Sequence, residues 1–155
     1  MSATTRVRRA TPDDLDPLAE LMAEFHREDH VVTDEARARK ALSGLLADPA
    51  LGRVWVVAAD DDIVAYVAIG FGFSLELGGK DAFVDEMYVR PAWRRQGLAA
   101  TVLESAARDA AEAGARALHL EVGRGNGTAR RVYERAGFIA REQYHLMTLS
   151  LGNLD

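Results

Sequence analysis

Apolar residues recur with a helical period near the start of the chain. Thr11 and Pro12 are typical of a helix start, and the apolar positions that follow at helical spacing are Leu15, Leu18, Leu21, Met22 and Phe25. A weak alternation over 5–10 predicts a short strand before this helix. A second helix is predicted from about Thr33 to Leu46, where Asp48-Pro49 would stop it.

The pattern then changes to that of β-strands. Residues 54–59 and 63–71 are rich in β-branched and aromatic residues, and Asp60-Asp61-Asp62 lies between them as a turn. This spacing predicts an antiparallel hairpin. A third long strand is predicted over 82–89 and ends at Arg90-Pro91.

The last third of the chain alternates between the two patterns. Residues 97–113 predict a helix closed by Gly114, 117–122 a strand, and 126–136 a short helix closed by Gly137. One or two strands are expected over 138–150. The predicted order is β-α-α-β-β-β-α-β-α-β(β), an α/β layer fold with helices on both faces of the sheet.

Composition narrows the class of protein. A chain of 155 residues with 48% apolar and 28% charged residues is typical of one soluble globular domain. It contains no cysteine, which excludes disulfides, thiolate zinc sites and cysteine nucleophiles. No apolar run approaches the length of a membrane span, and the N-terminus has no apolar signal core, so we expect a cytoplasmic location.

Charge is unevenly distributed. The net charge is −5, and residues 1–80 hold 9 Lys and Arg against 14 Asp and Glu. Residues 90–135 carry nine arginines against five acids. A basic stretch inside an acidic chain favours a small polyanionic ligand over nucleic acid, although a solvated helix surface would have the same composition.

The stretch 89–99 combines a strand end, a basic turn and a helix start. Unpaired N–H groups and the positive end of the helix dipole make such a place an anion site, and Gly97 allows close approach of a ligand. Arg94 and Arg95 add positive charge. The sequence has no P-loop motif, and the alternative is an ordinary loop glycine beside two solvated arginines.

The glycines at 123–127 do not fit the dinucleotide-binding pattern, because Thr128 and Arg130 stand where a glycine or alanine is required. On the helix that follows, Asn126 and Tyr133 lie on nearly the same side. They could line a cleft together. The alternative is a helix-capping asparagine and an aromatic residue at the edge of the core.

Three stretches together carry a resemblance to the GNAT superfamily of N-acetyltransferases. Arg94-x-x-Gly97-x-Ala99 resembles its pyrophosphate motif Q/R-x-x-G-x-G/A, and residues 84–91 resemble the preceding strand. Asn126-x-x-Ala129-x-x-x-Tyr133-x-x-x-Gly137-Phe138 is similar to a later motif. Arg95 and Ala99 each replace a commoner glycine. The resemblance covers nearly all of residues 1–155 and implies a single domain with a mixed, mostly antiparallel central sheet.

The resemblance also implies how acetyl-CoA would bind. The backbone of Met87 and Val89 would pair with the pantetheine arm as an added strand does. The pyrophosphate would lie against Arg94 and the amides of Arg95, Gln96, Gly97, Leu98 and Ala99. Asn126 would contact the pantetheine or a nearby backbone group, and Tyr133 would lie near the sulfur as general acid. No metal is implied.

A carboxylate must take the proton of an amine before the amine can attack a thioester. Asp85 and Glu86 are adjacent on a predicted strand and so face opposite sides. Similarity to members that acetylate diamines and aminoglycosides favours Asp85 as the base, with Glu86 as the alternative. Either carboxylate could instead pair with an arginine.

The expected activity is transfer of an acetyl group from acetyl-CoA to a primary amine of a small cationic molecule, by direct attack in a ternary complex. A protein N-terminus or lysine is the alternative acceptor, and an idle acyl-CoA-binding module the alternative role. The partners expected are acetyl-CoA and a small amine, with a homodimer as a candidate assembly and neither nucleic acid nor a membrane. The resemblance places Phe25, His26, Glu28 and Asp29 beside the acceptor pocket, unless they are a solvated helix end.

Overall fold

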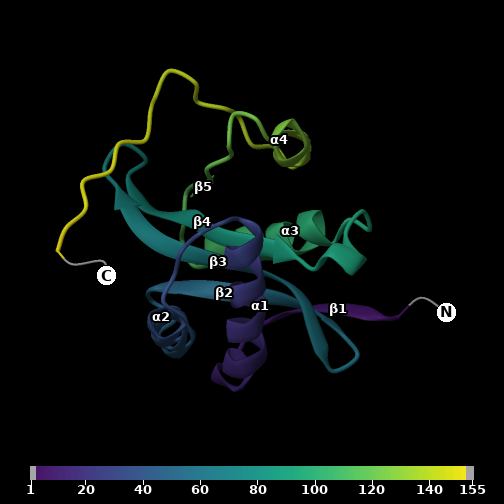
Figure 1. The fold of residues 1–155 in the computed structure, drawn as a ribbon. Coiled ribbons are helices and arrows are strands. Elements are labelled where there is room, and N and C mark those ends of the chain that lie inside the picture. The colour runs from purple at the N-terminus through teal and green to yellow at the C-terminus, as the bar shows by residue number, and fades with distance from the viewer. Residues whose placement is uncertain (1–2, 153–155) are drawn as a thin grey trace. The chain divides into compact units, whose positions relative to one another are not determined.

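A computed structural model of the chain describes residues 3–152 (Figure 1). It divides into two compact units, Met1–Glu121 and Val122–Asp155, which are described separately. The elements of the first unit are β1 (Thr5–Arg9), a 3₁₀ turn (Pro12–Asp14), α1 (Leu15–Glu28), α2 (Glu35–Ala47), β2 (Gly52–Ala59), β3 (Asp62–Ser74), β4 (Gly79–Val89), a second 3₁₀ turn (Pro91–Trp93), α3 (Leu98–Glu112) and β5 (Leu118–His119). The second unit contains α4 (Gly127–Arg135).

The five strands form one sheet in the order β1-β2-β3-β4-β5. The three pairings from β1 to β4 are antiparallel, and only β4 and β5 run parallel. The predicted mixed, mostly antiparallel sheet is therefore confirmed. The predicted hairpin is confirmed as well, since β2 and β3 pair along most of their length around the turn at 60–61.

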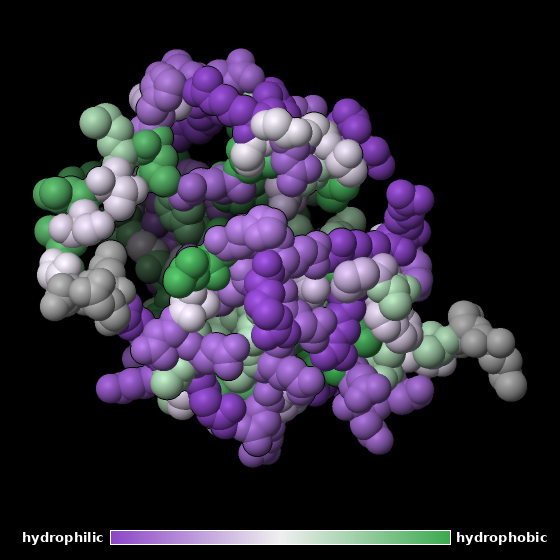
Figure 2. Space-filling view, viewed as in Figure 1, coloured by the Kyte–Doolittle hydropathy of each residue, from purple (hydrophilic) through white to green (hydrophobic). Residues whose placement is uncertain are grey.

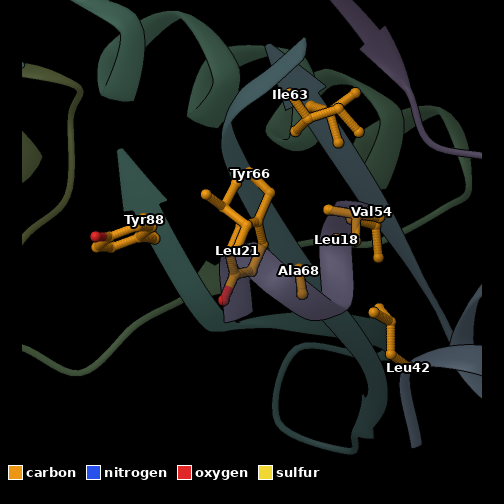
Figure 3. Packing of buried hydrophobic residues seen from close by; sticks show 9 residues of the cluster. Leu18, Leu21, Leu42, Val54, Ile63, Tyr66, Ala68 and Tyr88 are labelled. Atoms are coloured by element: carbon orange, nitrogen blue, oxygen red, sulfur yellow. The ribbon is translucent and has the colours of Figure 1, made fainter. Parts of the chain in front are cut away.

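Helices cover both faces of this sheet in the first unit. Helices α1 and α2 lie on one face and α3 on the other (Figure 1). The core on the first face joins Leu18 and Leu21 of α1 to Leu42 of α2 and to residues of β2, β3 and β4 (Figure 3). On the opposite face, α3 buries Val102 and Leu103 completely or almost so. This two-faced burial explains why β2 and β3 read as nearly continuous apolar runs.

The helix ends follow the local signals in the sequence. The Asp34 carboxylate accepts from the backbone N–H groups of Ala36 and Arg37 and so caps α2. Gly114 after α3 and Gly137 after α4 have φ of +98° and +103°. This left-handed conformation is the one that a glycine adopts at low cost, so both predicted helix closures are confirmed.

Two predicted strands differ from the structure. The strand expected over 117–122 is paired only at Leu118 and His119. Within residues 3–152, no strand forms over 138–150, where apolar side chains such as Leu146 and Met147 are exposed. Alternation of side chains describes only the faces of a strand, whereas a strand also requires the backbone of a partner.

Hydrophilic residues cover much of the face of the molecule seen in Figure 2. None of the helices formed by residues 3–152 has the length and apolar character needed to cross a membrane.

Asp14 joins β1 to the start of α1. The guanidinium of Arg8 donates to both of its carboxylate oxygens, at 2.8 and 2.9 Å, and the Thr11 N–H donates to Oδ2 at 2.8 Å. Asp14 is only 8% exposed. The bond from Arg8 holds the pKa of Asp14 below its ordinary value.

We expect Asp14→Asn to lower the free energy of unfolding by about 1.5–3 kcal/mol at neutral pH, as for loss of a hydrogen-bonded charge. Because the folded-state pKa of Asp14 is below the unfolded one, its stabilisation is present above about pH 4 and is lost as pH falls through the folded-state pKa. Urea unfolding of both proteins across this range measures the difference. Asp13→Asn, an exposed neighbour in the same turn, is the control. Equal losses in the two variants would contradict the role of Asp14.

Candidate active site

Strand β4 has one edge that β5 does not cover. On its β3 side it is paired as far as Val89, whereas β5 pairs only with Ala82 and Phe83. Among the described residues of the first unit, no strand therefore covers the other edge of β4 from Val84 to Val89. Backbone groups along such an edge can pair with an extended ligand.

The hydrogen-bond pattern shows which backbone groups face this edge. The N–H of Arg90 donates to the carbonyl of Val64 in β3 at 2.9 Å. Because backbone groups alternate in direction along an antiparallel strand, those of Met87 and Val89 point away from β3. The Val89 carbonyl accepts from Arg94 Nε at 2.9 Å, which agrees with this direction.

A β-bulge interrupts the pairing of β4 with β3. Ile69 lies opposite Val84 and Ala68 opposite Glu86, so Asp85 is an extra residue. Asp85 is exposed. In a regular strand without a bulge, Glu86 would share a face with Val84. With the bulge, Glu86 shares the face of Ala68, which belongs to the core beneath α1.

Glu86 meets α1 and β3 on that face. Its Oε2 is 2.6 Å from His26 Nε2, and its Oε1 accepts from the Tyr66 hydroxyl at 2.7 Å. His26 and Tyr66 are 7% and 3% exposed. Burial, and next the negative charge of Glu86, raise the pKa of Tyr66, so its hydroxyl stays protonated and acts as the donor.

Two further polar pairs continue this contact between α1 and β4. The Tyr88 hydroxyl donates to Glu28 Oε2 at 3.0 Å, and Arg90 donates to Glu24 Oε2 through Nε and a terminal nitrogen. Glu86 and Tyr88 of β4 and Arg90, the residue after it, therefore each bind a residue in the last two turns of α1.

The turn after β4 leads into the N-terminus of α3. Arg95 and Gly97 both adopt left-handed backbone conformations, with φ of +65° and +77°. Such a conformation costs about 1–3 kcal/mol for a residue other than glycine. Gly97 is the N-cap and has no side chain to bind the first-turn N–H groups, which lack partners within the helix. These groups and the helix dipole form an anion site.

Arg94 lies differently from the expectation for a phosphate ligand. One terminal nitrogen donates to both carboxylate oxygens of Glu28, at 2.7 and 2.9 Å, and the guanidinium lies 5.5 Å from the centre of the Tyr88 ring. The bond from Arg94 lowers the pKa of Glu28. Arg94 therefore ties this turn to the end of α1, whereas the neighbouring Arg95 is exposed.

Asn126 and Tyr133 belong to the second unit, where Asn126 is the N-cap of α4 and Tyr133 lies on that helix. The Asn126 side-chain oxygen caps the helix by accepting from the Ala129 N–H at 3.2 Å, which leaves its amide NH₂ group for other contacts. The Tyr133 ring packs edge-on against Phe138. Burial raises the pKa of Tyr133, which keeps its hydroxyl protonated.

The structure thus brings Glu86, Met87, Val89 and the 94–99 turn together in the first unit. Sequence reasoning missed the bonds of His26 and Tyr66 to Glu86. One signal for His26 was present, since it follows Met22 by four residues on the apolar side of its helix. In the described part of the chain, no three His, Asp or Glu side chains gather as metal ligands.

Residues 15–138 match the model of the acetyltransferase (GNAT) family. The chain belongs to this family. A curated relative, an uncharacterized N-acetyltransferase of Archaeoglobus fulgidus, is 33% identical over 130 residues, which cover 82% of this chain and 88% of the relative. The resemblance seen in the sequence is therefore confirmed, and this GNAT acetyltransferase is an enzyme of the N-acetyltransferase class.

Solved structures agree with this GNAT fold. An integron cassette protein from the mobile metagenome of Cole Harbour Salt Marsh is 35% identical, with a TM-score of 0.84 over 95% of this chain and 91% of that one. An aminoglycoside N-acetyltransferase in complex with CoA is 14% identical, with a TM-score of 0.81 over 97% and 98% of the two chains. At that identity the second structure supports the fold alone.

The left-handed turn at Gly97 predicts how this GNAT protein responds to acetyl-CoA. We expect acetyl-CoA at 100 times its Kd to raise the free energy of unfolding by about 2.7 kcal/mol. Gly97→Val should abolish the increase, because a branched side chain strains the turn and covers the anion site. Thermal unfolding with and without millimolar acetyl-CoA measures both effects.

Gly78→Val is the matched control. Gly78 has φ of +81° in the turn between β3 and β4, and a Cβ there would meet nothing within 4 Å, as at Gly97. Both variants should lose about 1–2 kcal/mol from strain, but only Gly78→Val should keep the response to acetyl-CoA. An unchanged response in Gly97→Val would refute the assignment of the turn.

Proposed function

We propose that residues 1–155 act as one acetyltransferase domain that moves the acetyl group of acetyl-CoA to a primary amine of a small cationic molecule. One observation carries the proposal: the uncovered edge of β4 runs directly into the left-handed turn and the N-terminus of α3. A ligand that fits has an extended arm with amide groups, which would pair with the strand edge. At the end of this arm it has a pyrophosphate, which would bind at the turn and the helix N-terminus.

The residues of the first unit fit acetyl-CoA in two places. The backbone groups of Met87 and Val89 face the open edge, where the amides of a pantetheine arm would pair with them. The N–H groups from Arg95 through Ala99 would hold the pyrophosphate at the start of α3. Arg94 would contribute by fixing this turn to Glu28. In the second unit, the free NH₂ of Asn126 would be the pantetheine donor.

We favour Glu86 over Asp85 as the general base. Its carboxylate is partly buried, one residue before Met87, and two protein groups hold its oxygens in place. Asp85 is the exposed extra residue of the bulge and remains the alternative. A general base must be held within hydrogen-bond reach of the proton that it removes, and the fixed carboxylate meets this requirement better.

The proposed reaction needs no enzyme-bound intermediate. The thioester supplies an activated acetyl group. Glu86 would take a proton from the ammonium form of the acceptor, and the freed nitrogen would bond to the acetyl carbonyl carbon. As the carbon–sulfur bond breaks, the Tyr133 hydroxyl would deliver its proton to the departing sulfur. The nitrogen would lose its second proton as it becomes the amide, which would restore the Tyr133 hydroxyl, and Glu86 would release the proton that it took to solvent. The absence of cysteine from the sequence excludes a cysteine acetyl-enzyme and supports direct attack.

The acidic first half of the chain supports a cationic acceptor. Several of its acids are already engaged, since Glu28 binds Arg94 and Glu35 lies 3.8 Å from Arg27. The proposal of a cationic acceptor therefore depends mainly on the negative charges of the exposed Asp85 and the partly buried Glu86. An alternative acceptor is a peptide N-terminus. A pocket of about 180 Å³ between α1 and α2 supports this alternative, because Met22, Val31 and Val32 line it and could contact the apolar side chains of a peptide.

Paired substitutions test the choice of base. We expect Glu86→Gln to lower kcat by roughly 10²–10⁴-fold, as for the loss of a general base. Asp85→Asn should retain most of the turnover, since its side chain is exposed at the bulge. Steady-state rates with saturating acetyl-CoA measure the two effects. The reverse order of losses would assign the base to Asp85.

The acceptor class is tested by free-thiol release from acetyl-CoA over a panel of amines. We expect kcat/KM to be higher for a polyamine or aminoglycoside than for a neutral amine, and to fall as salt screens the attraction. A preference for peptides with free N-termini would establish the alternative acceptor. Acetyl-CoA binding without thiol release on any amine would identify an idle acyl-CoA-binding module instead.

A further inference from the structure

His26 connects the proposed base to the loop between α1 and α2. Its Nε2 lies 2.6 Å from Glu86 Oε2, and its Nδ1 lies 3.0 Å from the Thr33 hydroxyl. The imidazole is buried, whereas Thr33 is exposed in the loop that precedes α2. One side chain thus spans the distance from a surface loop to a carboxylate on the sheet.

The chemistry of the two partners selects the tautomer of His26. An ionised carboxylate only accepts hydrogen bonds, so the nitrogen that faces Glu86 must carry the hydrogen. Nδ1 of the neutral ring is then an acceptor, and the Thr33 hydroxyl is the donor that it binds. Thr33 therefore stabilises the tautomer that donates to Glu86.

Tyr66 completes the arrangement from the other side. It donates to Oε1 of Glu86 while the imidazole donates to Oε2, so α1 and β3 each hold one carboxylate oxygen. Each oxygen keeps a further lone pair for another proton or donor. Two hydrogen bonds, one to each oxygen, fix the direction of the carboxylate.

We propose that His26 is a positioning residue for acetyl transfer, whose Nε2–H holds the Glu86 carboxylate in its orientation while Thr33 fixes the required tautomer. This inference rests on the proposed function, in which Glu86 is the base. His26 itself need not touch the substrate, because its effect passes entirely through the carboxylate.

The other titratable and charged groups around this pair come from four elements. They are Tyr66 of β3; Asp85 and Tyr88 of β4; Arg27 and Glu28 of α1; and Glu35 of α2. Arg27 pairs with Glu35, and Glu28 is bound by Tyr88 and Arg94. Besides the bond between them, His26 and Glu86 make side-chain hydrogen bonds with the hydroxyls of Thr33 and Tyr66.

Kinetics of His26→Leu and His26→Gln test the proposal in the full chain. Leucine is close to histidine in size but cannot donate, so kcat should fall by on the order of 10²-fold, as for a misplaced catalytic group, while the acceptor KM changes little. Glutamine can present an NH₂ near the position of Nε2 and should restore most of kcat.

His30→Asn is the matched control, because His30 is exposed in a left-handed conformation that asparagine tolerates. It should leave kcat unchanged. A purely structural role for His26 would lower the amount of folded enzyme in the leucine variant but would leave kcat per folded enzyme unchanged. An unchanged kcat per folded enzyme in His26→Leu, or no recovery in His26→Gln, would overturn the proposal.

Nitrogen NMR of the histidine rings tests the hydrogen bond without any activity. In the neutral form, His26 should be the Nε2–H tautomer, and Thr33→Val should raise the Nδ1–H fraction. An Nδ1–H tautomer in the unmodified protein would overturn the proposal, because Glu86 would then carry the shared proton. The expected tautomer without acetyl transfer to any amine would refute the proposed function and the role of His26 in it, while the hydrogen bond would stand.

Discussion

The bulge at Asp85 determines which face of the sheet receives the side chains at the end of β4. In a regular strand, Glu86 would share the face of Val84; the bulge leaves Asp85 unpaired and places Val84 and Glu86 on opposite faces. Glu86 and Tyr88 therefore face α1, and Arg90 reaches the same helix. The position of the carboxylate, its partners and the anchoring of the next turn all depend on this bulge.

Polar groups on that face are tolerated because each has a partner on α1. A carboxylate taken out of water without hydrogen bonds is strongly disfavoured, and Glu86 avoids this cost through donors on both oxygens. Glu28 is held in a similar way by Tyr88 and Arg94. The contact between α1 and β4 is thus a polar interface beside an aliphatic core. Its hydrogen bonds fix the orientation of the side chains more than they stabilise the fold.

Local signals in the sequence were sufficient for the helices, for the β2–β3 hairpin and for the turn at Gly97. They were not sufficient to predict the polar side-chain pairs between α1 and β4. His26 and Glu86 are 60 residues apart, as are Glu28 and Tyr88, and nothing in either neighbourhood specifies the other partner. Strict alternation predicts opposite faces for Asp85 and Glu86, but alternation is interrupted at the bulge, and local sequence could not identify Asp85 as the extra residue. The strands expected over 138–150 show the same limit, since pairing depends on distant backbone.

The open edge of β4 also bears on how copies of the protein behave toward each other in a concentrated solution. An uncovered strand edge is a template on which an extended segment of another chain can pair, and this is a common start of aggregation. Asp85 interrupts that template twice, because its bulge breaks the regular spacing of backbone groups and its charge repels a like-charged copy. A narrow ligand arm without side chains would avoid much of this obstruction, whereas a second polypeptide would not. The bulge residue at the face proposed for catalysis would thus also protect the protein from self-association.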